Sequence, residues 1–146
     1  MIDGAIFFLP NAPAGNAPDV SVVLDTSVRS GRIVARASVS GRVRAYEGPP
    51  DLAVEVVSPT NPQKDAVRLF TDYSRGGVGE YWLVDATGAD ATLTVFRRGE
   101  SSFEAAAVDA DGYQHSPVLQ ASYRFEEIVG GDGRPDYRLH ERPDDA

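Results

Sequence analysis

The sequence contains no cysteine, and this absence excludes disulfide bonds, cysteine zinc sites and catalysis by a thiolate. It contains only two histidines, His115 and His140, which stand too far apart in the sequence to predict a histidine metal site. Long apolar runs are also missing, because residues 5–9 are too few for a signal-peptide core or a membrane span. These absences predict a cytoplasmic protein that does not bind membranes.

Lysine is nearly absent as well, since Lys64 is the only one, and the formal net charge is −8. Acidic side chains gather near the C-terminus, where residues 126–146 contain seven acids and three arginines. The length of 146 residues suits one domain. We expect residues 1–128 to form this domain and residues 129–146 to form an acidic, mobile tail.

Positive charge is concentrated between residues 28 and 46, a stretch that contains five arginines and no acid. Two alternating runs inside it, residues 33–39 and 42–46, predict a β-hairpin. The arginines of such a hairpin form either a solvated outer face or a surface that contacts the phosphates of nucleic acid. The candidate contacts in the segment 29–44 are Arg32, Arg36, Arg42 and Arg44.

A buried acid is predicted in the middle of the chain. Residues 52–57 form an apolar run typical of a strand that is covered on both faces, yet Glu55 stands within it. A carboxylate placed there is costly unless a cation, a backbone donor or a metal ion pairs with it. Glu55 is therefore a candidate functional residue.

A helix is predicted over residues 62–75, directly after this strand. Asn61 suits the N-cap, and Pro62 suits the first helical position. One core-facing stripe consists of Ala66, Leu69, Phe70 and Tyr73. The glycines at 76 and 77 allow the left-handed conformation that ends a helix. Residues 80–85 follow as a strand, which completes the strand, helix, strand order of a crossover unit.

The remaining strands are predicted on either side of this unit. Residues 1–9 and 18–24 precede it, and a β-meander follows at residues 91–97, 103–108 and 118–125. The predicted fold class is α/β (α+β). It combines a mixed β-sheet with a crossover helix at 62–75 and a C-terminal β-meander.

Spacing along a strand limits which acid can share a metal ion with Glu55. Asp51 precedes Glu55 by four residues, which is roughly 13 Å along a regular strand. Two ligands of one Mg²⁺, each about 2.1 Å from the ion, lie no more than about 4 Å apart. The second ligand should come from a neighbouring strand, and Asp19 is the candidate. Asp51 is better suited to ordering the start of its strand, and it stays a third candidate ligand only if its backbone curls inward.

Several of these segments resemble one known family. They are Pro18-Asp19-Val20, residues 50–59 (PDLAVEVVSP), Tyr73 and residues 80–85 (EYWLVD). Together they closely resemble the Uma-two family of putative restriction endonucleases, which is placed in the PD-(D/E)XK nuclease superfamily. The resemblance covers residues 17–125 and implies a restriction-endonuclease-like domain with a mixed sheet flanked by helices.

The resemblance also implies a chemistry. A divalent metal ion, Mg²⁺ or Mn²⁺, would be held by Asp19 and Glu55. In that chemistry the metal polarises a phosphodiester and lowers the pKa of the water that attacks phosphorus, while a lysine offsets charge on the phosphate. The implied partner is nucleic acid, with DNA favoured over RNA.

The chain departs from the family at the position that carries this lysine. The resemblance places the lysine on the helix where this chain has Leu69. Lys64 stands about 140° around the helix from that position, and Arg68 stands about 100° away. Arg68 has a long, flexible stem, so it is the first substitute and Lys64 the second. A guanidinium binds phosphate but does not shuttle a proton, and the plainer interpretation of Arg68 is a solvent-facing helix residue.

The start of the chain departs from the family too. Its members carry an N-terminal helical segment with a further Glu, whereas only residues 1–18 precede Asp19 here. A truncated, degenerate or partner-completed domain is therefore expected, with a homodimer as one consequence. Two functions stay open. One is a metal-dependent endonuclease, and the other is a catalytically silent module that binds nucleic acid or protein through the arginine hairpin 29–44.

Overall fold

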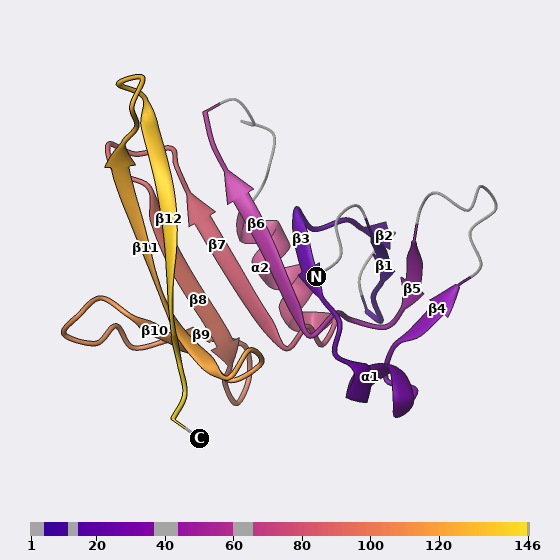
Figure 1. The fold of residues 1–146 in the computed structure, drawn as a ribbon. Coiled ribbons are helices and arrows are strands. Elements are labelled where there is room, and N and C mark those ends of the chain that lie inside the picture. The colour runs from indigo at the N-terminus through magenta and orange to yellow at the C-terminus, as the bar shows by residue number, and fades with distance from the viewer. Residues whose placement is uncertain (1–4, 12–14, 37–43, 60–65, 146) are drawn as a thin grey trace.

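The computed structural model describes residues 5–11, 15–36, 44–59 and 66–145, whose strands form three sheets (Figure 1). The central sheet has the strand order β3-β6-β7-β8-β9. The N-terminal sheet has the order β2-β1-β5-β4, and the C-terminal sheet has the order β10-β11-β12. This mixture of sheets with few helices confirms the predicted fold class.

The bounds of the elements follow the chain. The central sheet contains β3 (Val20–Val22), β6 (Leu52–Val57), β7 (Glu80–Asp85), β8 (Thr92–Arg98) and β9 (Phe103–Ala105). The N-terminal sheet contains β1 (Ile6–Phe8), β2 (Gly15–Asn16), β4 (Val34–Arg36) and β5 (Ala45–Glu47). The C-terminal sheet contains β10 (Gln114–Ser116), β11 (Ala121–Val129) and β12 (Pro135–Pro143). The helices are α1 (Asp25–Arg29) and α2 (Ala66–Arg75).

The crossover unit lies at the centre of the molecule. β6 and β7 pair in parallel with Glu55 opposite Leu83, and α2 connects them. β3 pairs antiparallel with β6, and β8 pairs antiparallel with β7. The predicted strands 52–57 and 80–85 are confirmed at their bounds. Gly79 permits the close approach at the start of the pair, because a Cβ there would lie 2.5 Å from the carbonyl oxygen of Asp51.

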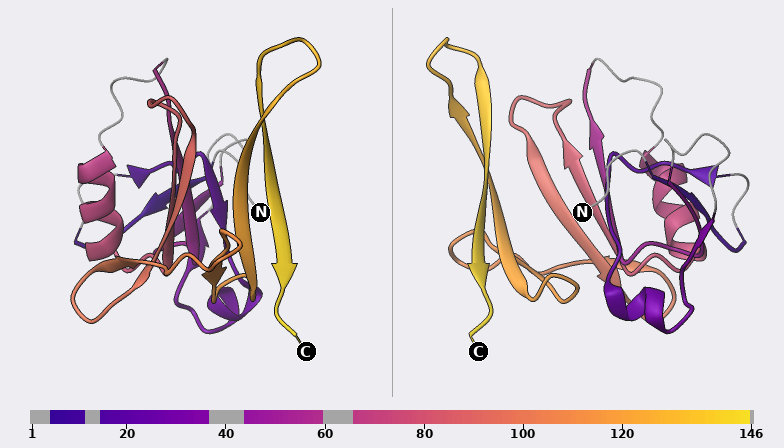
Figure 2. Two further views of the ribbon diagram at one scale, coloured as in Figure 1. Left: turned by 90° about the vertical axis from the view of Figure 1, so that its left-hand side faces the viewer. Right: turned by 45° about the vertical axis from the view of Figure 1, so that its right-hand side comes forward.

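The central sheet separates two cores. Figure 2 shows α2 on one face and the β11–β12 hairpin on the other. Successive residues of a strand point to opposite faces. Ala53 therefore packs with Leu69 and Tyr73 in the core beneath α2, whereas Leu52 packs with Trp82 in the core beneath the C-terminal sheet. Glu55 has the same parity as Ala53 and lies on the α2 face.

The predicted stripe of α2 is confirmed, because Leu69 and Tyr73 are buried. The helix ends as expected at the glycine pair, where Gly77 has φ +83° and the N–H of Val78 bonds the carbonyl oxygen of Tyr73 at 3.1 Å. Arg98 of β8 holds the same end by donating to the carbonyl oxygen of Ser74 at 2.6 Å. Neither helix in the described part of the chain has the length and apolar composition that a membrane span requires.

The arginine hairpin is present in part. β4 and β5 pair antiparallel with Ala35 opposite Tyr46, and the connection between them lies outside the described residues. β5 also pairs in parallel with β1, so the hairpin belongs to the N-terminal sheet. The start of the predicted segment, at Arg29, is the last turn of α1 instead of hairpin. The sequence did not predict α1, because five residues are too few to show a helical period.

The C-terminal meander is divided between two sheets. β9 is the last strand of the central sheet, and β10 begins the C-terminal sheet. The buried carboxylate of Glu80 joins these sheets, since it accepts bonds from Trp82 Nε1 at 3.0 Å, Ser116 Oγ at 2.8 Å and the N–H of Val118 at 2.8 Å. The sequence contained no signal for this second buried acid. Ser116 and Val118 are more than thirty residues away from Glu80, and Trp82 belongs to the same strand.

The segment 129–146, predicted as an acidic, mobile tail, contains the strand β12. β12 pairs with β11 over nine positions, from Ala121 opposite Pro143 to Val129 opposite Pro135. Two of its side chains pair with acids: Arg142 donates to Asp109 at 2.5 Å, and His140 contacts Glu126 at 2.5 Å. The hydrogen bond from Arg142 depresses the pKa of Asp109, and the bond from His140 depresses the pKa of Glu126. The acidic composition suggested a tail, whereas cross-strand charge pairs favour a strand.

Acid should loosen β12. The pKa values of Asp109 and Glu126 are lower in the folded protein than their ordinary values of 3.8 and 4.5. The stability that the two acids contribute is therefore present when the pH is above these ordinary values. It is lost as the pH falls below them, through the lower pKa values of the folded protein. Trp82 reports the change, since its ring centroid lies 4.9 Å from that of Tyr123 on β11. We expect its fluorescence to shift below about pH 4. The shift should be smaller in Arg142→Gln, and an equal acid response in both proteins would contradict these pairs.

Candidate functional site

Glu55 is buried on the α2 face of β6 and has a partner that the sequence did not identify. It is 2% exposed, and the hydroxyl of Tyr73 donates a hydrogen bond to its Oε1 at 2.5 Å. Tyr73 is 1% exposed and comes from the core stripe of α2. The stripe predicted the burial of Tyr73, but only the packing of α2 on the sheet shows that its hydroxyl reaches Glu55.

Asp19, an exposed residue directly before β3, lies beside Glu55. The register of β3 and β6 places Val20 opposite Val54, and its continuation by one residue brings Asp19 level with Glu55. A hydrogen bond fixes this position, because Asp19 Oδ2 accepts the N–H of Val56 at 2.7 Å. Opposite residues of an antiparallel pair lie on the same face of the sheet. The structure thus brings together the two acids that spacing selected, and we call them the carboxylate pair.

Two buried tyrosines lie close to the carboxylate pair. Burial, together with the charges of Glu55 and Asp19, raises the pKa of Tyr73 well above its ordinary value, and the hydrogen bond to Glu55 adds to the effect. Burial and the same two charges raise the pKa of Tyr81 as well. Both phenols are therefore protonated at any physiological pH and act as hydrogen-bond donors. The rings pack edge to face with centroids 5.4 Å apart.

The donor set fits a divalent metal ion of the Mg²⁺ class. Carboxylate oxygens from Asp19 and Glu55 are hard ligands, and Mg²⁺ in proteins is typically held by one or two carboxylates while it keeps several waters. The hydroxyl of Tyr81 is a buried polar atom near the pair with no hydrogen-bond partner among the described residues, as expected beside a hydrated ion. Within the described ranges, no cluster of three or more His, Cys, Asp or Glu has metal-binding geometry.

The core face of α2 does not carry the lysine that the family resemblance implies for binding the phosphate of a substrate. Leu69 is 7% exposed and packs in the core beneath α2, so the position of the family lysine is filled by an apolar side chain. Arg68 is exposed on the adjacent part of the same helix. Lys64 lies outside the described residues.

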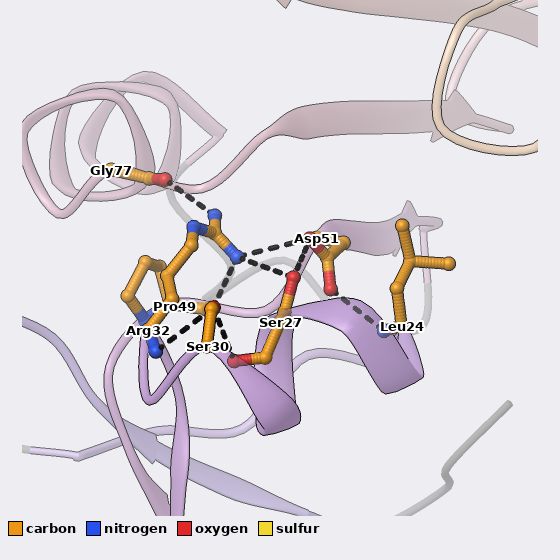
Figure 3. Close-up of polar contacts among 7 residues, drawn as sticks. All are labelled: Leu24, Ser27, Ser30, Arg32, Pro49, Asp51 and Gly77. Carbon is orange, nitrogen blue, oxygen red and sulfur yellow. Dashed lines mark hydrogen bonds and ion pairs between the residues drawn. The ribbon is translucent and has the colours of Figure 1, made fainter.

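Asp51 is held by structural contacts at the start of β6 (Figure 3). Its Oδ2 accepts the N–H of Leu24 at 2.7 Å, and its Oδ1 accepts the hydroxyl of Ser27 at 2.7 Å and Nη1 of Arg32 at 3.0 Å. The first two bonds attach α1 to the central sheet. These contacts agree with a role in ordering the strand, and we leave Asp51 out of the proposed metal ligands.

Arg32 connects three parts of the chain, although its side chain stays partly exposed. Besides Asp51, it donates to the carbonyl oxygens of Gly77 at 3.2 Å and Pro49 at 3.4 Å (Figure 3). It therefore ties the end of α2 to α1 and to the turn before β6. A side chain occupied in this way is a poor candidate for a nucleic-acid contact, although the sequence placed it among them.

The other predicted arginine contacts differ from one another. Arg36 pairs with Glu47 on the adjacent strand and stacks its guanidinium 4.7 Å from the ring centroid of Phe8. Arg44 is exposed directly before β5, and Arg42 lies outside the described residues. The stretch 28–46 contains no acid of its own, but Asp51 and Glu47 reach it from outside and neutralise part of its charge.

Comparison with known proteins identifies one family. Residues 4–126 match the family model Uma2, described as a putative restriction endonuclease. The match includes the carboxylate pair and the whole crossover unit, and it covers most of the chain. A search of curated proteins finds no match.

Replacement of Asp51 separates its structural contacts from metal binding. Asp51→Asn removes the charge that Arg32 pairs with. We expect the free energy of unfolding to fall by about 1–3 kcal/mol. This is less than the loss of a fully buried ion pair, because Arg32 is partly exposed. The Mg²⁺ concentration at half-maximal thermal stabilisation should stay unchanged. Asp25→Asn, at an exposed acid of α1, is the control. A weaker Mg²⁺ response with unchanged stability would make Asp51 a ligand.

Proposed function

Because this chain belongs to the Uma2 family of putative restriction endonucleases, we propose that it is a metal-dependent endonuclease that hydrolyses phosphodiester bonds of nucleic acid. The observation that carries the proposal is the carboxylate pair. Asp19 stands directly before β3 and bonds the backbone of β6, and Glu55 of β6 is held by Tyr73 of α2. Family membership supports the reaction class, and the carboxylate pair is the proposed binding site for the metal ion.

Each residue of the site has a distinct part in the proposed reaction. Asp19 and Glu55 would hold Mg²⁺ or Mn²⁺, and the bonds from the Val56 N–H and the Tyr73 hydroxyl keep the two carboxylates oriented. When bound, the ion supplies Lewis-acid polarisation of the phosphodiester and a water of lowered pKa. The orientation by Val56 and Tyr73 reduces the reorganisation that metal binding would otherwise require.

The remaining requirement is a positive charge for the phosphate. We assign it to Arg68, because it is exposed on α2 directly beside the position of the family lysine. A guanidinium offers several N–H donors in a fixed plane and binds phosphate oxygens in pairs. Lys64, which precedes α2 in the sequence, is the second candidate for this charge. DNA is the proposed substrate, and Arg44 and Arg42 are the proposed contacts to its backbone.

One observation favours a second candidate function. Leu69 is buried where the family has a lysine, so the chain lacks an ammonium group at the point from which it would reach the site. A protein that binds nucleic acid or another protein without cleaving is consistent with this departure. For such a protein, affinity for DNA would fall with rising salt and would not depend on Glu55.

Metal titration tests the carboxylate pair. A ligand at about 100 times its dissociation constant raises the free energy of unfolding by about 2.7 kcal/mol, so Mg²⁺ or Mn²⁺ should raise the Tm of the wild-type protein. We expect Glu55→Gln and Asp19→Asn to abolish most of this increase. The amide of Gln still accepts the Tyr73 bond, which keeps the comparison isosteric. Glu104→Gln, at an exposed acid of β9, should respond like the wild type. An unchanged metal response in Glu55→Gln refutes the proposed site.

A matched pair on α2 tests the phosphate-binding charge. Arg68→Ala should lower the rate of DNA cleavage by at least about 100-fold, the range seen when one donor to a transition-state oxyanion is removed. Arg75→Ala removes an exposed arginine from the last turn of the same helix and should leave the rate near that of the wild type. Equal rates in the two variants would exclude Arg68 from this role. Binding of DNA without any cleavage by the wild type favours the second candidate function.

A further inference from the structure

The strand β12 forms an open edge of the C-terminal sheet. In the sheet order β10-β11-β12, only β11 is bonded to it among the described strands. It is nine residues long, and all of its residues except His140 are exposed. Figure 2 shows the β11–β12 hairpin at the outer side of the molecule in both views. A long open edge is a template for pairing with another strand, and proteins usually block it with charges, prolines or bulges.

The backbone groups of β12 alternate between the two sides of the strand. Beyond one end of the ladder, the N–H of Asp144 bonds the carbonyl oxygen of Gln120 at 3.1 Å. Beyond the other end, the N–H of Gly130 bonds the carbonyl oxygen of Arg134 at 2.7 Å. Because hydrogen-bonded pairs alternate along an antiparallel ladder, the even-numbered residues of β12 bond β11 and the odd-numbered residues turn their backbone groups outward. The outward N–H groups are those of Tyr137, Leu139 and Glu141.

The prolines at the two ends of β12 agree with this direction. Pro135 and Pro143 have no N–H and stand at outward positions, so neither removes a bond to β11. Both also limit a further ladder, because a strand added on the outer side would find no N–H at either of them. Leu139 lies midway between the two prolines. The usable part of the edge is therefore symmetric about Leu139.

This symmetry suits pairing with a second copy of the same strand. In an antiparallel pair with a two-fold axis, the residue on the axis faces its own copy and must turn its backbone groups outward. An axis at Leu139 lets every outward N–H form a bond, with Tyr137 opposite the second copy's Glu141. An axis at Tyr137 would leave the N–H of Glu141 beyond the end of the partner strand. An axis at Glu141 would place two like charges opposite each other.

The charges of β12 are complementary in the same register. With Leu139 on the axis, Asp136 falls opposite the second copy's Arg142, and the two-fold axis creates this pair twice. Arg138 falls opposite the second copy's His140. Glu126 of β11 balances both positions, since it lies opposite Arg138 and contacts His140 within one chain. Opposite charges at facing positions stabilise a strand pair, so side chains that would repel many other strands favour this one.

The face of β12 that points to the central sheet adds apolar surface to this contact. Tyr137 stacks on Phe125 with centroids 5.5 Å apart and is still 45% exposed. Leu139 is 53% exposed and lines an apolar cavity of about 320 Å³ together with Phe125 and Trp82. Pairing about Leu139 would bring the second copy's Leu139 beside it and remove part of both side chains from water, which favours association.

We propose that β12 is a homodimerisation edge, at which two copies of this chain pair their β12 strands antiparallel about Leu139. The two C-terminal sheets then join into one continuous sheet. Because the contact consists of one strand from each copy, it belongs to the small, weak class of interfaces, with a dissociation constant in the micromolar range. It uses neither Asp19 nor Glu55, so it does not rest on the proposed function.

Sedimentation equilibrium of the full chain tests the inference. Between about 1 μM and about 1 mM, the mean mass of the wild type should rise from 15.7 kDa toward twice that value. Leu139→Lys and Leu139→Glu each place like charges on the axis, and each should raise the dissociation constant at least about tenfold. Val129→Lys makes the same change at an 81% exposed residue of β11 and should associate like the wild type.

A mixture of the two charged variants tests the register. In equal amounts, Leu139→Lys and Leu139→Glu should associate at least about tenfold more tightly than either variant alone, because opposite charges then meet on the axis. This recovery requires that position 139 faces itself, and it also shows that both variants are folded. A mixture that associates no better than its components excludes pairing about Leu139.

Two further results would overturn the inference. One is a wild type that stays monomeric up to the highest concentration, which would leave the edge of β12 to a strand of a different protein or to no partner. The other is a dimer that Leu139→Lys does not weaken, which would place the interface on another surface. Neither result bears on the proposed function, because the Mg²⁺ titration of the carboxylate pair decides that separately.

Discussion

The hydrogen bond between Tyr73 and Glu55 is the interaction on which this structure depends most. It is made between a phenol and a carboxylate that are both buried, so neither group can exchange its partner for bulk water. Through it, α2 is held to β6 at a fixed rotation and height. That position of α2 covers the core face of the central sheet, places Leu69 in the core and leaves Arg68 at the surface. The packing of α2 and the orientation of the proposed metal ligand Glu55 therefore depend on the same hydrogen bond. Replacing Tyr73 or Glu55 should disturb both.

The parts of the fold that the sequence predicted are those with a strong local pattern. The bounds 52–57 and 80–85 follow from apolar runs between turn residues, and the stripe and glycine stop of α2 follow from helical spacing. The rise per residue of a strand set Asp51 aside as a partner of Glu55, and Asp19 was then the candidate from a neighbouring strand. Tyr73 and Tyr81 escaped notice as site residues, because an aromatic side chain on a core stripe shows no sign of where its hydroxyl points.

The parts that the sequence missed depend on contacts between distant segments. Arg32 stood in a stretch without acids, and its partner Asp51 comes from beyond that stretch. The strand β12 is composed of polar and charged residues, so its sequence does not indicate a buried face, and its order comes from pairing with β11. In both cases the charge pattern was interpreted as solvent-directed, whereas the folded chain places opposite charges against each other. Local composition cannot show such pairings, since they are set by topology.

The two buried acids of the parallel strand pair lie on opposite faces of the central sheet. Glu55 faces α2 and the proposed chemistry, and Glu80 faces the C-terminal sheet, where the bonds it accepts from Trp82, Ser116 and Val118 are structural. The central sheet separates the two carboxylates, so the bonds that attach the C-terminal sheet through Glu80 share no residue with the bond that holds α2 through Glu55.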